Sequence, residues 1–137
     1  MVKNTLLHVW PIPAFDDNYI WCIHDGESAL VVDPGDAGPV LDYLESQALT
    51  LTGILITHHH ADHTGGIMDL LAYVANESLP VYGPAAEVIP GRTQALMEGD
   101  RVECTAPAIA FTVLEVPGHT LGHIAFYSAP VLFSGDT

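Results

Sequence analysis

The chain has 137 residues and carries 3 Lys or Arg against 17 Asp or Glu, for a formal net charge of -14. This length suits one domain, and a hydrophobic content of 49% argues against intrinsic disorder. Nucleic acids and anionic membranes are bound through Lys and Arg, and only Lys3, Arg92 and Arg101 are available. The composition therefore disfavours both partners, and an anionic substrate would need positive charge from another source, such as a metal ion.

The elements predicted along the chain alternate between strands and helices. Short apolar runs bounded by turn residues predict strands, and apolar residues three or four positions apart predict helices. In chain order, we expect strands at residues 5–9, 18–24 and 29–33, a helix from Pro39 to about Gln47, a strand at 53–56, a helix at 67–75 and a short strand at 81–82. Further on, we expect a helical turn within 84–89, a loop over 90–98, and strands at 101–104, 109–116, 122–127 and 131–133. This order predicts a mixed α/β domain.

The two cysteines and the N-terminus favour a reducing, cytoplasmic location. Cys22 and Cys104 are far apart and lack CxxC spacing, so we expect buried reduced thiols and no disulfide. The first residues do not resemble a signal peptide. No segment reaches the ~18 apolar residues of a membrane span.

The segment from His58 to His63 is the most informative part of the sequence. It contains four His and one Asp, follows a predicted buried strand and precedes a helix, the place where α/β folds present ligand groups. Side chains two positions apart in extended backbone point the same way, so His58 and His60 are predicted to bind one ion, and His59 to point away. Asp62 and His63 would hold a second ion. Zinc suits these ligands, and so do iron and manganese. An expression tag would lie at a terminus and would not contain this Asp.

Other ligands must come from later strand ends. His119 follows the strand predicted at 109–116 and is a candidate third ligand, and Asp136 could bridge two ions. His123 and Asp33 are expected to contact the ligands rather than the metal, because ligating groups need partners of their own. His8 and His24 are expected to be ordinary strand residues.

Four segments carry a resemblance to a known family. Residues 57–66 (THHHADHTGG) resemble the THxHxDHxGG signature of the metallo-β-lactamase superfamily, and VDPG at 32–35, PGHT at 117–120 and SGDT at 134–137 match its other landmarks in order. Within that superfamily, residues 12–21 (IPAFDDNYIW) and 117–123 (PGHTLGH) resemble bacterial glyoxalase II, the hydroxyacylglutathione hydrolases.

The resemblance implies an αββα sandwich of two similar halves, of which this chain has the first half and the start of the second. It implies a first metal held by His58, His60 and His119, a second held by Asp62 and His63, and Asp136 bridging both. In the family, a later His completes the second site, and glutathione is bound by the later region and a C-terminal helical domain. Residues 1–137 would then form an apparently truncated catalytic domain.

The activity implied by the resemblance is hydrolysis of S-(2-hydroxyacyl)glutathione, such as S-lactoylglutathione, to glutathione and a 2-hydroxy acid, a step of methylglyoxal detoxification. A metal lowers the pKa of bound water to about 7 and so supplies hydroxide, which Asp62 would help to orient. A thiol with a pKa near 8.5 leaves without a strong general acid. The sequence has no GxSxG nucleophile elbow.

Two alternatives remain open at this point. One is another hydrolase of the superfamily, such as a lactonase or β-lactamase, since a nuclease would need more basic residues. The other is a truncated metal-binding module with little activity. Half a sandwich would leave an apolar face and sheet edges uncovered, so we also expect self-association.

Overall fold

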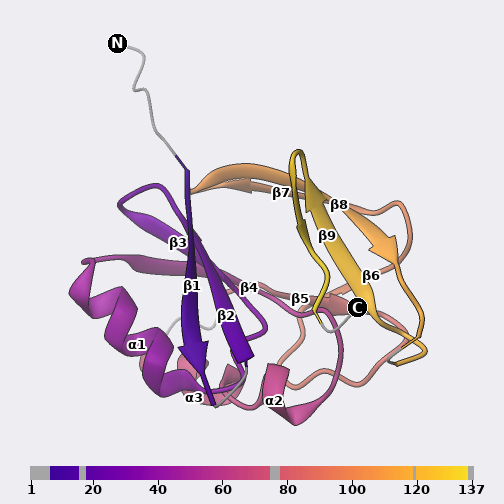
Figure 1. The fold of residues 1–137 in the computed structure, drawn as a ribbon, viewed down its shortest axis with the longest axis horizontal. Helices are drawn as coiled ribbons and strands as arrows, with labels where there is room; N and C mark the ends of the chain where they lie inside the picture. Colours follow the sequence, from indigo (N-terminus) through magenta and orange to yellow (C-terminus); the bar gives the residue numbers. More distant parts are fainter. Residues whose placement is uncertain (1–6, 16–17, 75–77, 119, 136–137) are drawn as a thin grey trace.

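The computed structural model describes residues 7–15, 18–74, 78–118 and 120–135. It contains a six-stranded sheet in the order β1-β2-β3-β4-β5-β6 and a four-stranded antiparallel sheet in the order β10-β9-β8-β7 (Figure 1). The first sheet comprises β1 (His8–Ala14), β2 (Asn18–His24), β3 (Ser28–Val32), β4 (Thr50–Leu55), β5 (Val81–Pro84) and β6 (Gln94–Leu96). The second comprises β7 (Arg101–Thr105), β8 (Ala108–Glu115), β9 (Ile124–Ser128) and β10 (Val131–Phe133). The helices are α1 (Ala37–Ser46), α2 (Ala61–Thr64) and α3 (Ile67–Val74).

Strands β3 to β6 pair in parallel, and this direction positions the site. The register pairs Val32 of β3 with Leu55 of β4, and Leu55 with Tyr82 of β5. The segments that follow these three strands therefore leave the sheet side by side. In α/β folds, this carboxyl edge is where ligand groups gather.

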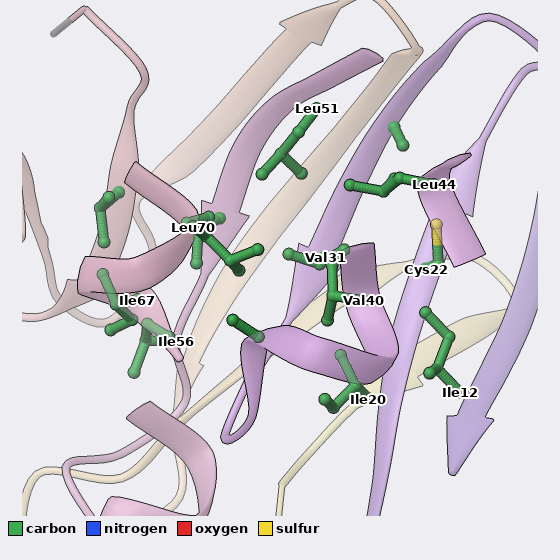
Figure 2. Close-up of a cluster of buried hydrophobic side chains, with 14 of the residues drawn as sticks. Ile12, Ile20, Cys22, Val31, Val40, Leu44, Leu51, Ile56, Ile67 and Leu70 are labelled. Atoms are coloured by element: carbon green, nitrogen blue, oxygen red, sulfur yellow. The ribbon is translucent and has the colours of Figure 1, made fainter. Parts of the chain in front are cut away.

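The core has two layers, one on each face of the six-stranded sheet. Successive side chains of β3 point to opposite faces of the sheet. Ala29 and Val31 pack toward the helices, whereas Leu30 and Val32 pack toward the second sheet, so the strand is apolar at every position, as expected when both faces are buried. Figure 2 shows the helix-side layer, where Val40 and Leu44 of α1 and Ile67 and Leu70 of α3 meet side chains of the strands. Phe111, Phe126 and Phe133 fill the layer between the two sheets. The described residues thus form helix, sheet and sheet layers.

Several predicted elements are confirmed, and the strand at residues 18–24 has the predicted bounds. Helix α1 has Pro39 in its first turn as expected, and Asp36 caps its N-terminus by accepting a hydrogen bond from the Gly38 amide at 3.1 Å. The predicted pair at 101–104 and 109–116 forms the antiparallel strands β7 and β8. Cys22 and Cys104 are free thiols as expected, but only Cys22 is buried, which raises its pKa to about 12, whereas Cys104 is half-buried.

Three local predictions were wrong. The strand predicted at residues 5–9 is found at His8–Ala14, which includes Pro11 and Pro13; residues 5 and 6 lie outside the described residues. Strand β1 is at the edge of the sheet, which tolerates proline because one side needs no hydrogen-bond donors. Residues 94–96, predicted as loop, form the short opposite edge β6. Residues 85–87 form a turn and bend where a helical turn was predicted. No helix in the described part of the chain is long and apolar enough to cross a membrane.

Candidate metal centre

Three segments that carry polar side chains leave the carboxyl ends of adjacent parallel strands. Asp33 follows β3, the segment 57–63 follows β4, and Glu87 lies three residues beyond β5. Asp33, His58 and His63 are buried, and one ligand atom from each lies within 4.8 Å of the others. This group and the fold around it indicate a metal cofactor.

The His-rich segment brings three imidazoles close together. The ring centroid of His58 lies 5.0 Å from that of His60 and 4.2 Å from that of His63. His59 was predicted to point away from the pair of His58 and His60, but its ring centroid also lies 5.0 Å from that of His60, and its Nδ1 lies 2.9 Å from the carboxylate of Glu87. Predicted ligands His119 and Asp136 lie outside the described residues.

A buried hydrogen-bond network behind these imidazoles sets where their protons lie. Asp33 accepts from the backbone amide of Thr57 at 2.7 Å and from the Thr57 hydroxyl at 2.6 Å. Because the hydroxyl proton goes to Asp33, Thr57 Oγ1 accepts from Nδ1 of His58 at 2.8 Å. Nδ1 of His63 likewise donates to Asp33 at 3.0 Å. Both imidazoles then carry the proton on Nδ1 and the lone pair on Nε2, the tautomer that suits a metal ligand.

These contacts use both carboxylate oxygens of Asp33. Its two carboxylate oxygens together meet three donor groups, from Thr57 and from His63. These contacts orient the imidazoles, and the supporting role expected of Asp33 stays a prediction.

Glycines allow the loops after β3 and β4 to touch. A Cβ on Gly35 would collide with the backbone carbonyl of Asp62. A Cβ on Gly66 would lie 2.6 Å from the carbonyl oxygen of Pro34, which accepts a hydrogen bond from the Gly66 amide at 2.8 Å. Glycines at positions 35, 65 and 66 therefore matter because side chains there would separate the loops.

Asp62 is half exposed and lies beside His63. Its Oδ2 accepts a hydrogen bond from Asn18 Nδ2 at 3.0 Å and lies 3.6 Å from Nε2 of His63. Partial burial raises the pKa of Asp62, but the hydrogen bond from Asn18 and the neighbouring His63 and His58 outweigh this effect and lower that pKa. The side chain is therefore an ionised carboxylate at neutral pH. Asn18 was not predicted as a site residue, because its contact with Asp62 spans 44 positions of the sequence.

His123 packs against the metal segment from the second sheet. It is buried, its ring stacks on His58 at 4.5 Å and 20°, and its Nε2 lies 2.7 Å from the carbonyl oxygen of Ser134. A Cβ on Gly135 would collide with Thr57 and would lie 2.7 Å from Nε2 of His123. The chain just before Asp136 is therefore held closely against Thr57 and His123.

A cleft of about 410 Å³ opens beside the site. Asp33, His63 and Asn18 line its polar side, and Tyr19, Trp21 and Phe133 supply an aromatic wall. An apolar wall next to a few polar groups is typical of small-molecule sites.

Known proteins resemble this chain in sequence and in fold. The hydroxyacylglutathione hydrolase of Cupriavidus metallidurans is 55% identical over 96% of this chain, and the chain spans 53% of that relative's length. The crystal structure of the BLEG-1 B3 metallo-beta-lactamase superposes with a TM-score of 0.77 and 25% identity, covering 94% of this chain and 72% of that one. The di-iron-bound form of TTHA1623 superposes with a TM-score of 0.62 and 26% identity, covering 98% and 69%.

These structures confirm the predicted metallo-β-lactamase-like fold. The sequence pattern described as the metallo-beta-lactamase superfamily matches residues 14–137, nearly the whole chain. With its strand-end histidines and its two-sheet core, the chain belongs to the metallo-beta-lactamase superfamily.

Proposed function

We propose that this chain is the metal-binding part of a hydroxyacylglutathione hydrolase, which splits S-(2-hydroxyacyl)glutathione, such as S-lactoylglutathione, into glutathione and a 2-hydroxy acid. The observation that carries the proposal is the 55% identity to a curated hydroxyacylglutathione hydrolase over 96% of the chain. Reduced thiols at Cys22 and Cys104 fit a cytoplasmic location, where methylglyoxal would be detoxified.

The proposed ligands are the ones expected from the sequence. His58, His60 and His119 would hold the first ion, Asp62 and His63 the second, and Asp136 would bridge them. The Nδ1 contacts of His58 and His63 support this set, because they leave the lone pairs on Nε2. Zinc is the proposed metal. The di-iron-bound TTHA1623 supports a two-ion site and keeps iron as an alternative.

The chemistry follows from how these side chains are held. When bound, the metal would lower the pKa of water and polarise the thioester carbonyl. Asp62, kept ionised with help from Asn18, would accept a hydrogen bond from the attacking water and orient it. The aromatic wall of Tyr19, Trp21 and Phe133 would cover the acyl group from bulk water. The glutathione thiolate can leave without a strong general acid, since a thiol pKa is near 8.5.

Metal analysis combined with a hydrolysis assay tests the proposal. The purified chain should contain at least one ion, and His58→Ala should remove most of that metal together with thioester hydrolysis. His8→Ala is the matched control, because His8 is an exposed histidine on the edge strand β1 and should retain both. An unchanged metal content in His58→Ala would reject the ligand assignment. Faster hydrolysis of a lactone or β-lactam than of the thioester would reject the substrate class.

A further inference from the structure

The Glu87 carboxylate lies between two segments that carry proposed metal ligands. Its Oε1 accepts from the backbone amide of His59 at 2.8 Å and lies 2.9 Å from the His59 ring, and its Oε2 accepts from the Gly122 amide at 2.9 Å. The side chain of Glu87 is only 5% exposed. Its two oxygens therefore join the segment after β4 to the segment that leads into β9.

The carboxylate is ionised in this position. Burial raises the pKa of Glu87, but the nearby Thr120 hydroxyl and the hydrogen bonds from His59 and Gly122 outweigh this effect and lower the pKa to about 2. Hydrogen bonds to a charged acceptor are shorter and about twice as strong as neutral ones. The link between the two segments is therefore stronger than an ordinary loop contact.

The surroundings of Glu87 are built for close approach and rigidity. A Cβ on Gly122 would lie 2.5 Å from Cγ of Glu87, so a larger residue would displace the carboxylate. On the other side, Nη1 of Arg92 donates to the carbonyl oxygens of Glu87 at 2.6 Å and Pro84 at 2.7 Å. One of the chain's three basic residues thus fixes the turn from which Glu87 projects.

We propose that Glu87 is a positioning residue that sets the spacing between the His58–His60 pair and the segment containing His119. His59, which it holds through backbone and ring, lies between the first two proposed ligands. Gly122 follows the third proposed ligand by three positions. This inference rests on the proposed ligand set, and it gives His59 a part in linking the two segments.

Replacing Glu87 by Gln isolates the bridging carboxylate. Gln has the same shape but only one acceptor oxygen, so its amide NH₂ must face a backbone N–H on one side of the bridge. We expect Co²⁺ affinity, measured by competition with a chromophoric chelator, to fall about 10- to 100-fold, as it does when groups that support ligands are changed. The visible absorption bands of bound Co²⁺, which report ligand geometry, should also shift.

Asp25→Asn is the matched control. Asp25 also accepts backbone amide hydrogen bonds, from Glu27 at 2.9 Å and from Ser28 at 2.8 Å, but it lies in the turn before β3, at the opposite end of that strand from Asp33. It should leave Co²⁺ affinity and spectrum unchanged. His59→Ala keeps the backbone amide contact and loses only the ring contact, so it should weaken Co²⁺ binding less than Glu87→Gln does.

The outcomes separate the two proposals. A wild-type chain that binds no Co²⁺ would reject the proposed metal site itself. Tight wild-type binding with the same affinity and spectrum in Glu87→Gln would overturn only the role of Glu87. If circular dichroism shows that Glu87→Gln does not fold, the Co²⁺ affinities of Gly122→Ala and His59→Ala test the role of Glu87 instead. Weakened binding in both supports the role, and unchanged binding in either overturns it.

Discussion

Two groups of histidines on this chain differ in what their ring nitrogens do. At the metal centre, Nδ1 of His58 and of His63 donates to Thr57 and Asp33, which leaves the Nε2 lone pair for a ligand role. On β2, Nδ1 of His24 accepts from the Gly26 amide at 3.1 Å, so its Nε2 carries the proton and donates to the Tyr43 hydroxyl at 3.1 Å.

The His24 ring also stacks on His8, with centroids 5.0 Å apart. Two close imidazoles are therefore not sufficient for a metal site. The partner of Nδ1 decides whether Nε2 carries a lone pair that could bind a metal. By this criterion, His58 and His63 form a ligand-type cluster, and His24 with His8 forms a structural cluster.

The largest expected effect comes from removing the acceptor behind the metal-centre imidazoles. In Asp33→Asn, the amide NH₂ faces donors from Thr57 or His63, so the ring orientation is lost. We expect metal affinity to fall about 10- to 100-fold and the free energy of unfolding of the metal-free chain to fall by about 1–3 kcal/mol. Chelator competition and urea unfolding measure the two effects. Retained affinity would mean that the network does not define the ligand cluster.

A smaller loss of stability is expected from a change in the structural cluster around His24. Tyr43→Phe removes the hydroxyl that pairs with His24 and leaves the rest of the ring, which also stacks on Trp10. The free energy of unfolding should fall by about 0.5–1.5 kcal/mol, and metal content should not change. A loss of metal in this variant would show that the two clusters are coupled.

The smallest effect is a pH dependence. Burial, together with the charge of His8, lowers the pKa of His24 in the folded chain. The folded state therefore binds fewer protons than the unfolded state, so His24 stabilises the fold above about pH 6.5, and this contribution is lost as the pH falls through the lowered pKa. Urea unfolding across this range should show that His24→Gln loses less stability on acidification than wild type. An equal loss would assign the pH dependence to other groups.

The ligand cluster was the part of the site most accessible from the sequence. The spacing of His58 and His60 after a buried strand predicted that they share one side, because the two-residue period of extended backbone is a local property. Their ring centroids lie 5.0 Å apart, but those of the adjacent His59 and His60 do as well, so this distance does not test the prediction. A supporting role for Asp33 was also predicted and stays a prediction, and the structure places Asp33 in contact with Thr57 and His63.

What could not be predicted depends on distant segments meeting. Asn18 reaches Asp62 across 44 positions, and Glu87 reaches Gly122 across 35. No periodicity encodes such contacts, since they depend on the order of the parallel strands. The misplaced start of β1 has a related cause: proline is acceptable there only because tertiary structure makes β1 an edge strand.

The hydrogen-bond network around Asp33 joins residues that are far apart in the sequence, and this affects folding. Asp33 contacts Thr57 across 24 positions and His63 across 30, through strands joined in parallel by the crossover helix α1. Contacts of this separation form slowly, because chain closure must precede them. An unfolded chain would offer a metal only the neighbouring histidines, without the contacts that fix their tautomers. Metal should therefore bind the folded chain more tightly than the unfolded one and raise its melting temperature in proportion to that difference.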